Sequence, residues 1–435
     1  MKALLIILDG IADRPERSLG GRTPLEAANL PRLDHLAASG MCGHMYPVSP
    51  GICTSSDIAL WRMLGYGAYP YPGRAGIEAV GAGVPLEDGD AVFRVNMATT
   101  LEQDGLRYVQ AAPAYLPDDQ AAAVYEALAA YEPAYFGARL HHLGGPFMAL
   151  VLSGGASREV TDSDPLFYRL PVPAILPFEG AREEAERTAE ELDRFAGWAA
   201  RTMESHPVSV ARREGGMTAP DYVLVKWPSA PPRVPPFATS WGFDAVSCAT
   251  GVFYTGLGLA LGMEIAVEHE QPVVHRPDDP GQDLARKIDD ALTALRSGRE
   301  FAFVHTKAPD EASHTGRPSR KVSVCEELDG ALEAVVEGIA GDPDVLTIIT
   351  ADHATPSGGS EDVIHSGESV PVIMTGANVR VDRVASFDEV SCAAGALGLI
   401  NGADLMPLIL NFTNRARFAN SRLTPEEIPY RELPR

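Results

Sequence analysis

Residues 3–10 read Ala-Leu-Leu-Ile-Ile-Leu-Asp-Gly, and this segment decides the fold class. Six apolar residues in a row, without polar alternation, are typical of a strand that is buried on both faces of a parallel sheet. Asp9 ends the run too early for a signal-peptide core or a membrane span. The segment therefore predicts an internal strand with a carboxylate at its end.

Two later β-like runs also end in polar residues. Residues 301–305 lead to Asp310, and residues 345–350 end at Asp352. Between the runs lie segments with helical period, such as 284–295, where apolar residues recur every three or four positions. This alternation predicts an α/β fold, in which helices cover both faces of the sheet. Ligands of such sheets bind beyond the carboxyl ends of the strands, where these polar residues fall.

The middle of the chain has a different texture. It contains an acidic, Ala/Glu-rich helix candidate at 182–201 and ends in the proline-rich stretch 228–236. Such a stretch is a good hinge or linker because proline removes hydrogen-bond donors and stiffens the chain. We therefore predict a smaller α+β domain of residues 99–236, inserted into an α/β domain of residues 1–98 and 237–435.

The charge of the chain excludes several partners. The 435 residues include 36 Lys and Arg against 59 Asp and Glu, which gives a net charge of -23. Nucleic acid and anionic membranes would be repelled, so we expect neither as a partner. An anionic substrate must then be held locally, by metal ions or a few arginines.

Five scattered cysteines indicate a reducing compartment and predict a cytoplasmic protein, while the oligomeric state stays open.

Three local clusters carry the oxygen and imidazole ligands that borderline divalent metals accept. The clusters are Asp9, Asp310 with His314, and Asp352-His353 followed by His365. Each fragment alone is weak evidence, since an aspartate after a strand is usually a helix cap. Their shared position after β-like runs gives them weight, and together they suffice for two metal ions. The other histidines, His305 among them, are interpreted as ordinary core or surface groups.

A nucleophile candidate lies in Thr54-Ser55-Ser56-Asp57, at the start of a segment with helical pattern. A serine at a helix start is most often a cap. The same position also exposes a hydroxyl beside free backbone N–H groups and the positive end of the helix dipole, which favours phosphate. Coordination to a divalent metal would activate such a hydroxyl without a neighbouring base.

Further motifs occur in a fixed order along nearly the whole chain. They include Leu8-Asp9-Gly10, Ser56-Asp57, Gly73-Arg74, His305-Thr-Lys307, Asp310-Glu-Ala-Ser-His314, Asp352-His353-Ala-Thr-Pro356 and His365-Ser-Gly367. This ordered set resembles the archaeal-type cofactor-independent phosphoglycerate mutases of the alkaline-phosphatase superfamily. The resemblance implies an alkaline-phosphatase-like sheet covered by helices on both faces, with a smaller inserted domain that binds substrate.

The resemblance also implies roles for single residues. One metal would lie among Asp9, Ser56, Asp352 and His353, and the other among Asp310, His314 and His365. Ser56 would take the phosphoryl group from one hydroxyl of phosphoglycerate and return it to the other. Manganese or zinc are the implied ions, with magnesium or cobalt as further options and no organic cofactor. The expected substrate contacts are Asp57, Arg74, Lys226 and Lys307.

The sequence departs from the family pattern near the substrate. Ser55 replaces a glycine, which leaves Ser55 or Thr54 as an alternative nucleophile, and Phe147, Leu166 and Thr255 stand where basic groups are expected. A phosphate or carboxylate without its charged partners binds weakly, so we predict that conversion of 2-phosphoglycerate to 3-phosphoglycerate is weak or absent compared with the family norm. Another arginine could restore it. The nearest candidates are Arg139, Arg158 and Arg233.

Three functions are compatible with this pattern. The leading hypothesis is a mutase-like phosphotransferase for a small phosphorylated or phosphonylated acid. The first alternative is a metal-dependent phosphatase or phosphodiesterase, or a transferase for a different ester, and release of phosphate would identify a hydrolase. The second alternative is a catalytically silent metal- or metabolite-binding protein, which the full ligand set beside Ser56 disfavours.

Overall fold

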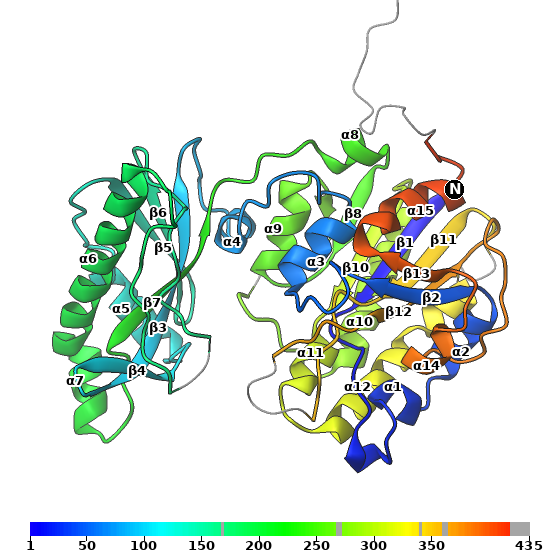
Figure 1. Cartoon of the computed structure of the whole chain (residues 1–435), viewed down its shortest axis with the longest axis horizontal. Coiled ribbons are helices and arrows are strands. Elements are labelled where there is room, and N and C mark those ends of the chain that lie inside the picture. The colour runs from blue at the N-terminus through cyan, green and yellow to red at the C-terminus, as the bar shows by residue number, and fades with distance from the viewer. Residues whose placement is uncertain (167–168, 267–271, 339–341, 359–363, 418–435) are drawn as a thin grey trace, which may run out of the picture.

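The structure is a computed structural model that describes residues 1–166, 169–266, 272–338, 342–358 and 364–417 (Figure 1). Its larger sheet has the strand order β13-β2-β12-β11-β1-β10-β8-β9. The strands are β1 (Lys2–Leu8), β2 (Met41–Tyr46), β8 (Ala245–Cys248), β9 (Glu264–Ile265), β10 (Phe301–Thr306), β11 (Val345–Thr350), β12 (Val370–Thr375) and β13 (Gly398–Asn401). Among all the residues that the structure describes, no helix is both long and apolar enough to cross a membrane.

The first predicted strand lies inside the sheet. β1 pairs in parallel with β10 on one side and β11 on the other, and Ile6 is opposite both Val304 and Ile349. Residues 3–8 are fully buried, as their unbroken apolar run requires. The three β-like runs therefore end at one edge, where the polar residues after them meet. The sheet is not parallel throughout, because β12 runs antiparallel to β11 and β2.

Helices flank this sheet, which confirms the predicted α/β class (Figure 1). The stripe of α10 (Pro280–Arg296) is buried, and Asp279 caps the helix by accepting the Gln282 N–H at 2.9 Å. The other helices of this part are α1 (Pro24–Ala27), α2 (Pro31–Ala38), α3 (Ser56–Met63), α8 (Phe237–Trp241), α9 (Val252–Ala260), α11 (Ala308–Ser313), α12 (Pro318–Ala331), α13 (Glu333–Gly338), α14 (Glu389–Cys392) and α15 (Leu405–Phe412).

A second, antiparallel sheet forms a separate lobe on the left of Figure 1. Its strands are β3 (Ala91–Gln103), β4 (Leu106–Ala111), β5 (Gly137–Gly144), β6 (Phe147–Ser153) and β7 (Tyr222–Ser229), and its helices are α5 (Asp118–Leu128), α6 (Glu183–Ser205) and α7 (Pro207–Glu214). Phe93, Leu150 and Phe195 belong to a core of its own. β3 begins at Ala91, so the predicted boundary at residue 98 falls inside a strand. Independent folding of this lobe stays a prediction.

Helix α4 (Arg74–Gly81) connects the two lobes. It packs so closely on α9 of the larger lobe that a Cβ atom added at Gly81 would lie 1.9 Å from the carbonyl oxygen of Val252. It also contacts β3 and β7 of the smaller lobe. This contact places Arg74 and Glu78 between the lobes.

Candidate metal centre and phosphotransfer site

Two groups of candidate ligands gather at the carboxyl edge of the larger sheet. Asp9, Asp352 and His353 form the first group, and their ligand atoms lie within 4.8 Å of one another. All three residues are buried. Asp9 follows β1 and the other two follow β11, so the central pairing of the sheet brings them together.

Ser56 points into this first group. Its Oγ lies 3.2 Å from Asp9 Oδ2 and 3.2 Å from His353 Nε2. The residue is buried at the first position of α3, so it faces the ligands from a helix N-terminus. The geometry places an oxygen nucleophile among groups that bind divalent metals.

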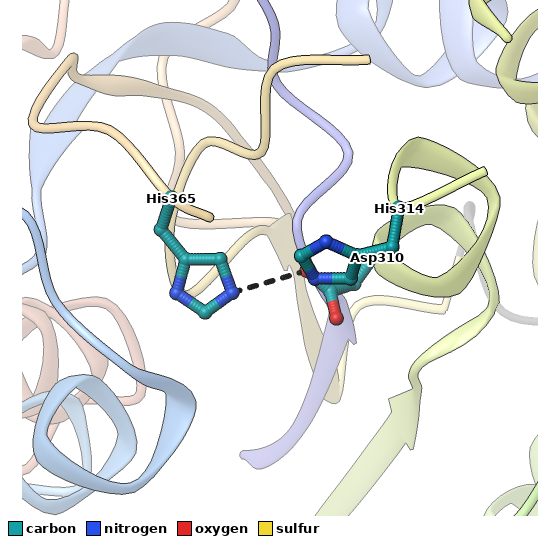
Figure 2. A group of neighbouring side chains, drawn as sticks. All are labelled: Asp310, His314 and His365. Carbon is teal, nitrogen blue, oxygen red and sulfur yellow. Dashed lines mark ion pairs between the residues drawn. The ribbon is translucent and has the colours of Figure 1, made fainter. Parts of the chain in front are cut away.

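Asp310, His314 and His365 form the second group (Figure 2). The Nε2 atoms of both histidines lie 3.3 Å from Asp310 Oδ1. Asp310 lies in α11 and His314 caps its end, as the spacing of four predicts. The ring of His365 is oriented by Nδ1, which lies 2.8 Å from the carbonyl oxygen of Thr54. Since a carbonyl can only accept, Nδ1 carries the proton and Nε2 is free to bind a metal.

Thr355 connects the two groups. Its hydroxyl donates to Asp310 Oδ1 at 2.8 Å, and its oxygen lies 3.0 Å from Nδ1 of His353. Because the hydroxyl proton is used on Asp310, Nδ1 of His353 must donate. The Nε2 atom of His353 therefore presents a lone pair towards Asp9 and Ser56, which suits a metal ligand.

The charge of the site is balanced unevenly. Burial alone would raise the pKa of Asp9 and Asp310, but the ammonium of Lys307 holds both pKa values low. Its Nζ lies 2.7 Å from Asp310 Oδ2 and 3.6 Å from Asp9 Oδ2. Burial and the nearby Asp9 charge raise the pKa of Asp352 well above its usual range. Asp9 Oδ1 and Asp352 Oδ2 are buried and accept no hydrogen bond from the described residues. These oxygens fit divalent cations, which would neutralise them.

Comparison with known proteins identifies the family. The model of the Metalloenzyme superfamily matches residues 1–412. The 2,3-bisphosphoglycerate-independent phosphoglycerate mutase 2 of Methanocaldococcus jannaschii is 33% identical, covering 96% of this chain and 94% of its own length. The 2,3-bisphosphoglycerate-independent phosphoglycerate mutase of Methanopyrus kandleri is 34% identical, with 95% and 97% covered. This chain belongs to the cofactor-independent phosphoglycerate mutase family of the metalloenzyme superfamily.

Solved structures agree with this membership. The cofactor-independent phosphoglycerate mutase from Thermoplasma acidophilum has a TM-score of 0.62 and 28% identity, covering 95% of this chain and 100% of that chain. The PH0037 protein from Pyrococcus horikoshii has a TM-score of 0.76 at 28% identity, with 97% and 99% covered. The predicted family and fold are confirmed, and the chain is a metal-dependent phosphotransferase of the mutase type. The hydrolase alternative is not favoured.

Sequence reasoning missed two residues that hold Asp9. Tyr254 donates its hydroxyl to Asp9 Oδ2 at 3.0 Å, and His305 Nε2 lies 3.0 Å from the same oxygen. The two rings stack with centroids 3.8 Å apart. His305 is buried, as a core interpretation requires, yet it supports a candidate metal ligand. Its position two residues before Lys307, on the same side of an extended chain, was an available signal.

The two serines before α3 have different partners. Ser55 is the N-cap residue, and its hydroxyl donates to Asp57 Oδ1. Tyr71 donates to the other oxygen of Asp57 at 2.6 Å. Asp57, an expected substrate contact, is therefore engaged in holding Ser55 and Tyr71. Only Ser56 of this pair contacts the candidate ligands.

A cavity of about 230 Å³ lies where the two lobes meet. Arg74, Lys226 and Lys307, three of the expected substrate contacts, line it. Arg94, which sequence reasoning did not consider, also lines it and is buried. The guanidinium of Arg94 lies 4.3 Å from the ring centroid of Phe147. The strand next to Phe147 thus supplies a cation near the position where the resemblance predicts one.

The three arginines nominated from the sequence have other partners. Arg139 pairs with Asp90 at 2.9 Å, Arg233 pairs with Asp88 at 2.5 Å, and Arg158 donates to the carbonyl oxygens of Tyr71 and Pro72. All three lie outside the set of described residues that lines the cavity. The prediction that one of these three arginines enters the site was wrong, because it relied on closeness in sequence. Arg94 reaches the cavity through the pairing of β3 with β6. Weak or absent conversion of phosphoglycerate stays a prediction, and the cation that Arg94 supplies weakens one of its grounds.

Proposed function

We propose that this chain moves a phosphoryl group between two hydroxyls of a small phosphorylated acid, through a phosphoserine at Ser56. The position of Ser56 Oγ, 3.2 Å from both Asp9 and His353, carries the proposal. The substrate we propose is phosphoglycerate, because the relatives that resemble the chain over nearly its whole length are phosphoglycerate mutases. The free state of the cysteines, all five of which the structure describes, supports a reducing, cytoplasmic location.

The same ligand groups would hold two divalent ions. Asp9, Ser56, Asp352 and His353 would bind one, and Asp310, His314 and His365 the other. Manganese or zinc suits these oxygen and nitrogen donors, with magnesium or cobalt as further options. When bound, such ions supply positive charge for the transferring phosphoryl group and lower the pKa of the serine hydroxyl.

The residues of the chain orient the reaction. The N-terminus of α3 directs backbone N–H groups to the phosphate on Ser56. Ser56 Oγ forms a bond to phosphorus while the bond from phosphorus to the substrate oxygen breaks, and the serine proton ends on that oxygen. The second transfer reverses these changes at the other hydroxyl. The reaction consumes no water, and the site must keep water out while the phosphoserine exists.

The cavity supplies the charge that an anionic acid requires. Arg74, Arg94, Lys226 and Lys307 bring four cations to it, whereas the chain as a whole is strongly negative. Glu78 pairs with both arginines, and Asp164 pairs with Lys226 at 2.5 Å. These carboxylates fix the directions of the cationic groups before substrate arrives, and such preorganisation strengthens binding.

The direct test follows 3-phosphoglycerate by phosphorus NMR with protein loaded with manganese. We expect the 2-phosphoglycerate signal to appear without inorganic phosphate. A Ser56→Ala protein prepared in the same way is the control for background conversion. Release of phosphate as the main product would support a hydrolase instead, and no turnover of either isomer would refute the proposal.

A further inference from the structure

Trp227 has an unusual backbone conformation beside the cavity. Its φ is 56°, in the left-handed region that bulky side chains avoid, and the next residue is Pro228. In the pairing of β3 with β7, Val92 is opposite Ser229 and Arg94 is opposite Lys226. Between these two pairs β7 has one residue more than β3, and such an extra residue in one strand is a β-bulge. Glycine suits such a position, so a tryptophan there indicates strain that the surroundings maintain.

Hydrogen bonds hold this bulge in place. Asp162 Oδ1 accepts the N–H of Trp227 at 2.9 Å, and the carbonyl oxygen of Trp227 accepts the Ser229 hydroxyl at 2.7 Å. Both peptide groups of the bulged residue are thereby satisfied although they leave the ladder. The side chain lines the cavity between the lobes.

The indole ring organises the cations of the cavity. The guanidinium of Arg74 lies 4.5 Å from a Trp227 ring centroid, Lys226 Nζ lies 4.4 Å away, and the guanidinium of Arg94 lies 5.9 Å away. The guanidinium of Arg74 also lies 4.9 Å from the ring centroid of Phe253. Cations this close to aromatic rings are attracted to them. One side chain from β7 thus contacts basic groups that come from α4, β3 and β7.

We propose that Trp227 is a specificity-determining residue, which limits the size of the acid and holds Arg74 and Arg94 in position for it. This inference rests on the proposed mutase function. A cavity of about 230 Å³ is small for a ligand site, and the indole occupies space that a longer acid would need. The substrate class is therefore a phosphorylated hydroxy acid about as long as phosphoglycerate.

The test compares wild type with Trp227→Gly and Trp227→Phe, using 3-phosphoglycerate and the longer 4-phosphoerythronate. For Trp227→Gly we expect the kcat/KM preference for 3-phosphoglycerate to fall about tenfold or more, mainly through a higher KM. Trp227→Phe keeps an aromatic ring, and we expect its preference to stay within about threefold of wild type. Glycine accepts a positive φ, so this variant should fold, and Trp227→Asn is a second small replacement that tolerates the same conformation.

The outcomes separate the inference from the function on which it rests. Wild-type turnover of phosphoglycerate with an unchanged preference in folded Trp227→Gly and Trp227→Asn would overturn the inference alone. Absence of wild-type turnover, together with no calorimetric binding of either acid to the manganese-loaded Ser56→Ala protein, would refute both. A loss of turnover in Trp227→Gly with equal effects on both acids would indicate a structural role only and would also overturn the inference.

Discussion

Ser55 and Ser56 are adjacent in the chain, but their hydroxyls face different surroundings. Ser55 occupies the N-cap position of α3 and donates to Asp57, whereas Ser56 Oγ contacts Asp9 and His353. The sequence could place a nucleophile at the start of this helix. The helix pattern alone could not choose between the two hydroxyls, because the choice depends on which one the distant loop with His353 approaches, and only the resemblance favoured Ser56.

We predict that Ser56→Ala lowers mutase turnover by at least about a thousandfold, since removal of a nucleophile has effects of that size or larger. Metal binding should be largely retained because Asp9, Asp352 and His353 remain. Calorimetric metal titration and a turnover assay measure both properties. Ser55→Ala is the matched control, and we expect less than about a tenfold change from it. The reverse result, with a greater loss of turnover in Ser55→Ala than in Ser56→Ala, would show that Ser55 is the nucleophile.

Glu389 provides a pH test at a distance from the candidate ligands. It accepts the Asp13 N–H at 2.9 Å and the Thr23 hydroxyl at 2.6 Å, and burial raises its pKa from 4.5 to about 7. As the pH rises, Glu389 therefore loses its proton at a lower pH in the unfolded chain than in the native protein. The stability that a neutral Glu389 permits is present in full below pH 4.5 and is lost as the pH rises through 7.

We predict that Glu389→Gln removes this loss, because glutamine stays neutral and keeps an oxygen acceptor. The free energy of unfolding of the variant minus that of wild type should increase by on the order of 2 kcal/mol between pH 4.5 and pH 8, a figure that allows for the partial exposure of the side chain. Urea denaturation at several pH values measures this difference. A difference that does not change with pH would contradict the expectation.

At the scale of elements, a buried lysine on α12 joins the two loops that carry the first ligand group. Lys321 is fully buried and donates to the carbonyl oxygens of Ala12 at 3.0 Å and Thr355 at 2.8 Å. It also pairs with Asp13 at 3.1 Å. Ala12 follows β1 and Thr355 follows β11, so this one ammonium fixes the spacing of the loops after both strands.

We predict that Lys321→Met lowers the free energy of unfolding by about 3 kcal/mol or more, because it leaves the buried Asp13 carboxylate without its partner. Manganese affinity should fall about tenfold or more, since the loop with Asp352 and His353 loses its anchor. Arg320→Met is the control on the same helix. Arg320 is exposed, so we expect a change below about 1 kcal/mol. Normal manganese affinity in folded Lys321→Met would contradict the positioning role.

The elements also show where sequence reasoning succeeds. The apolar run of β1 and the stripe of α10 were predictable because local hydrophobic period follows burial directly. Asp9, Asp352 and His353 were predictable as candidate ligands because they come directly after such runs. The antiparallel course of β12 and the bulge at Trp227 were not predictable, because both depend on how distant strands pair. Arg94 was missed for the same reason, since its burial depends on Glu78 and Phe147.

At the scale of the whole molecule, the site concentrates charge that the rest of the fold does not balance. The site holds three buried aspartates, and among the described residues Lys307 is the one ammonium group that pairs with any of them, namely with Asp9 and Asp310. The two lobes meet at a cavity rich in basic groups, although the chain carries a net charge of -23. Bound divalent ions would therefore contribute to stability as well as to catalysis.

We predict that chelation with EDTA lowers the melting temperature and that added manganese restores it. Free metal at a thousandfold excess over its dissociation constant stabilises the native state by about 4 kcal/mol per site. Differential scanning calorimetry measures the shift. His365→Ala lacks a ligand of the second group and should respond less to chelation than wild type. An unchanged melting temperature after chelation, in protein shown to hold metal beforehand, would contradict the proposed centre.

The central claim is that phosphate passes through Ser56. Mass spectrometric mapping of wild-type protein, rapidly quenched during turnover of 3-phosphoglycerate with manganese, tests it most directly. We predict phosphate on Ser56, with none on this residue in chelated protein. Phosphate on Thr54 or Ser55, or isomerisation without any covalent phosphate on the protein, would contradict it.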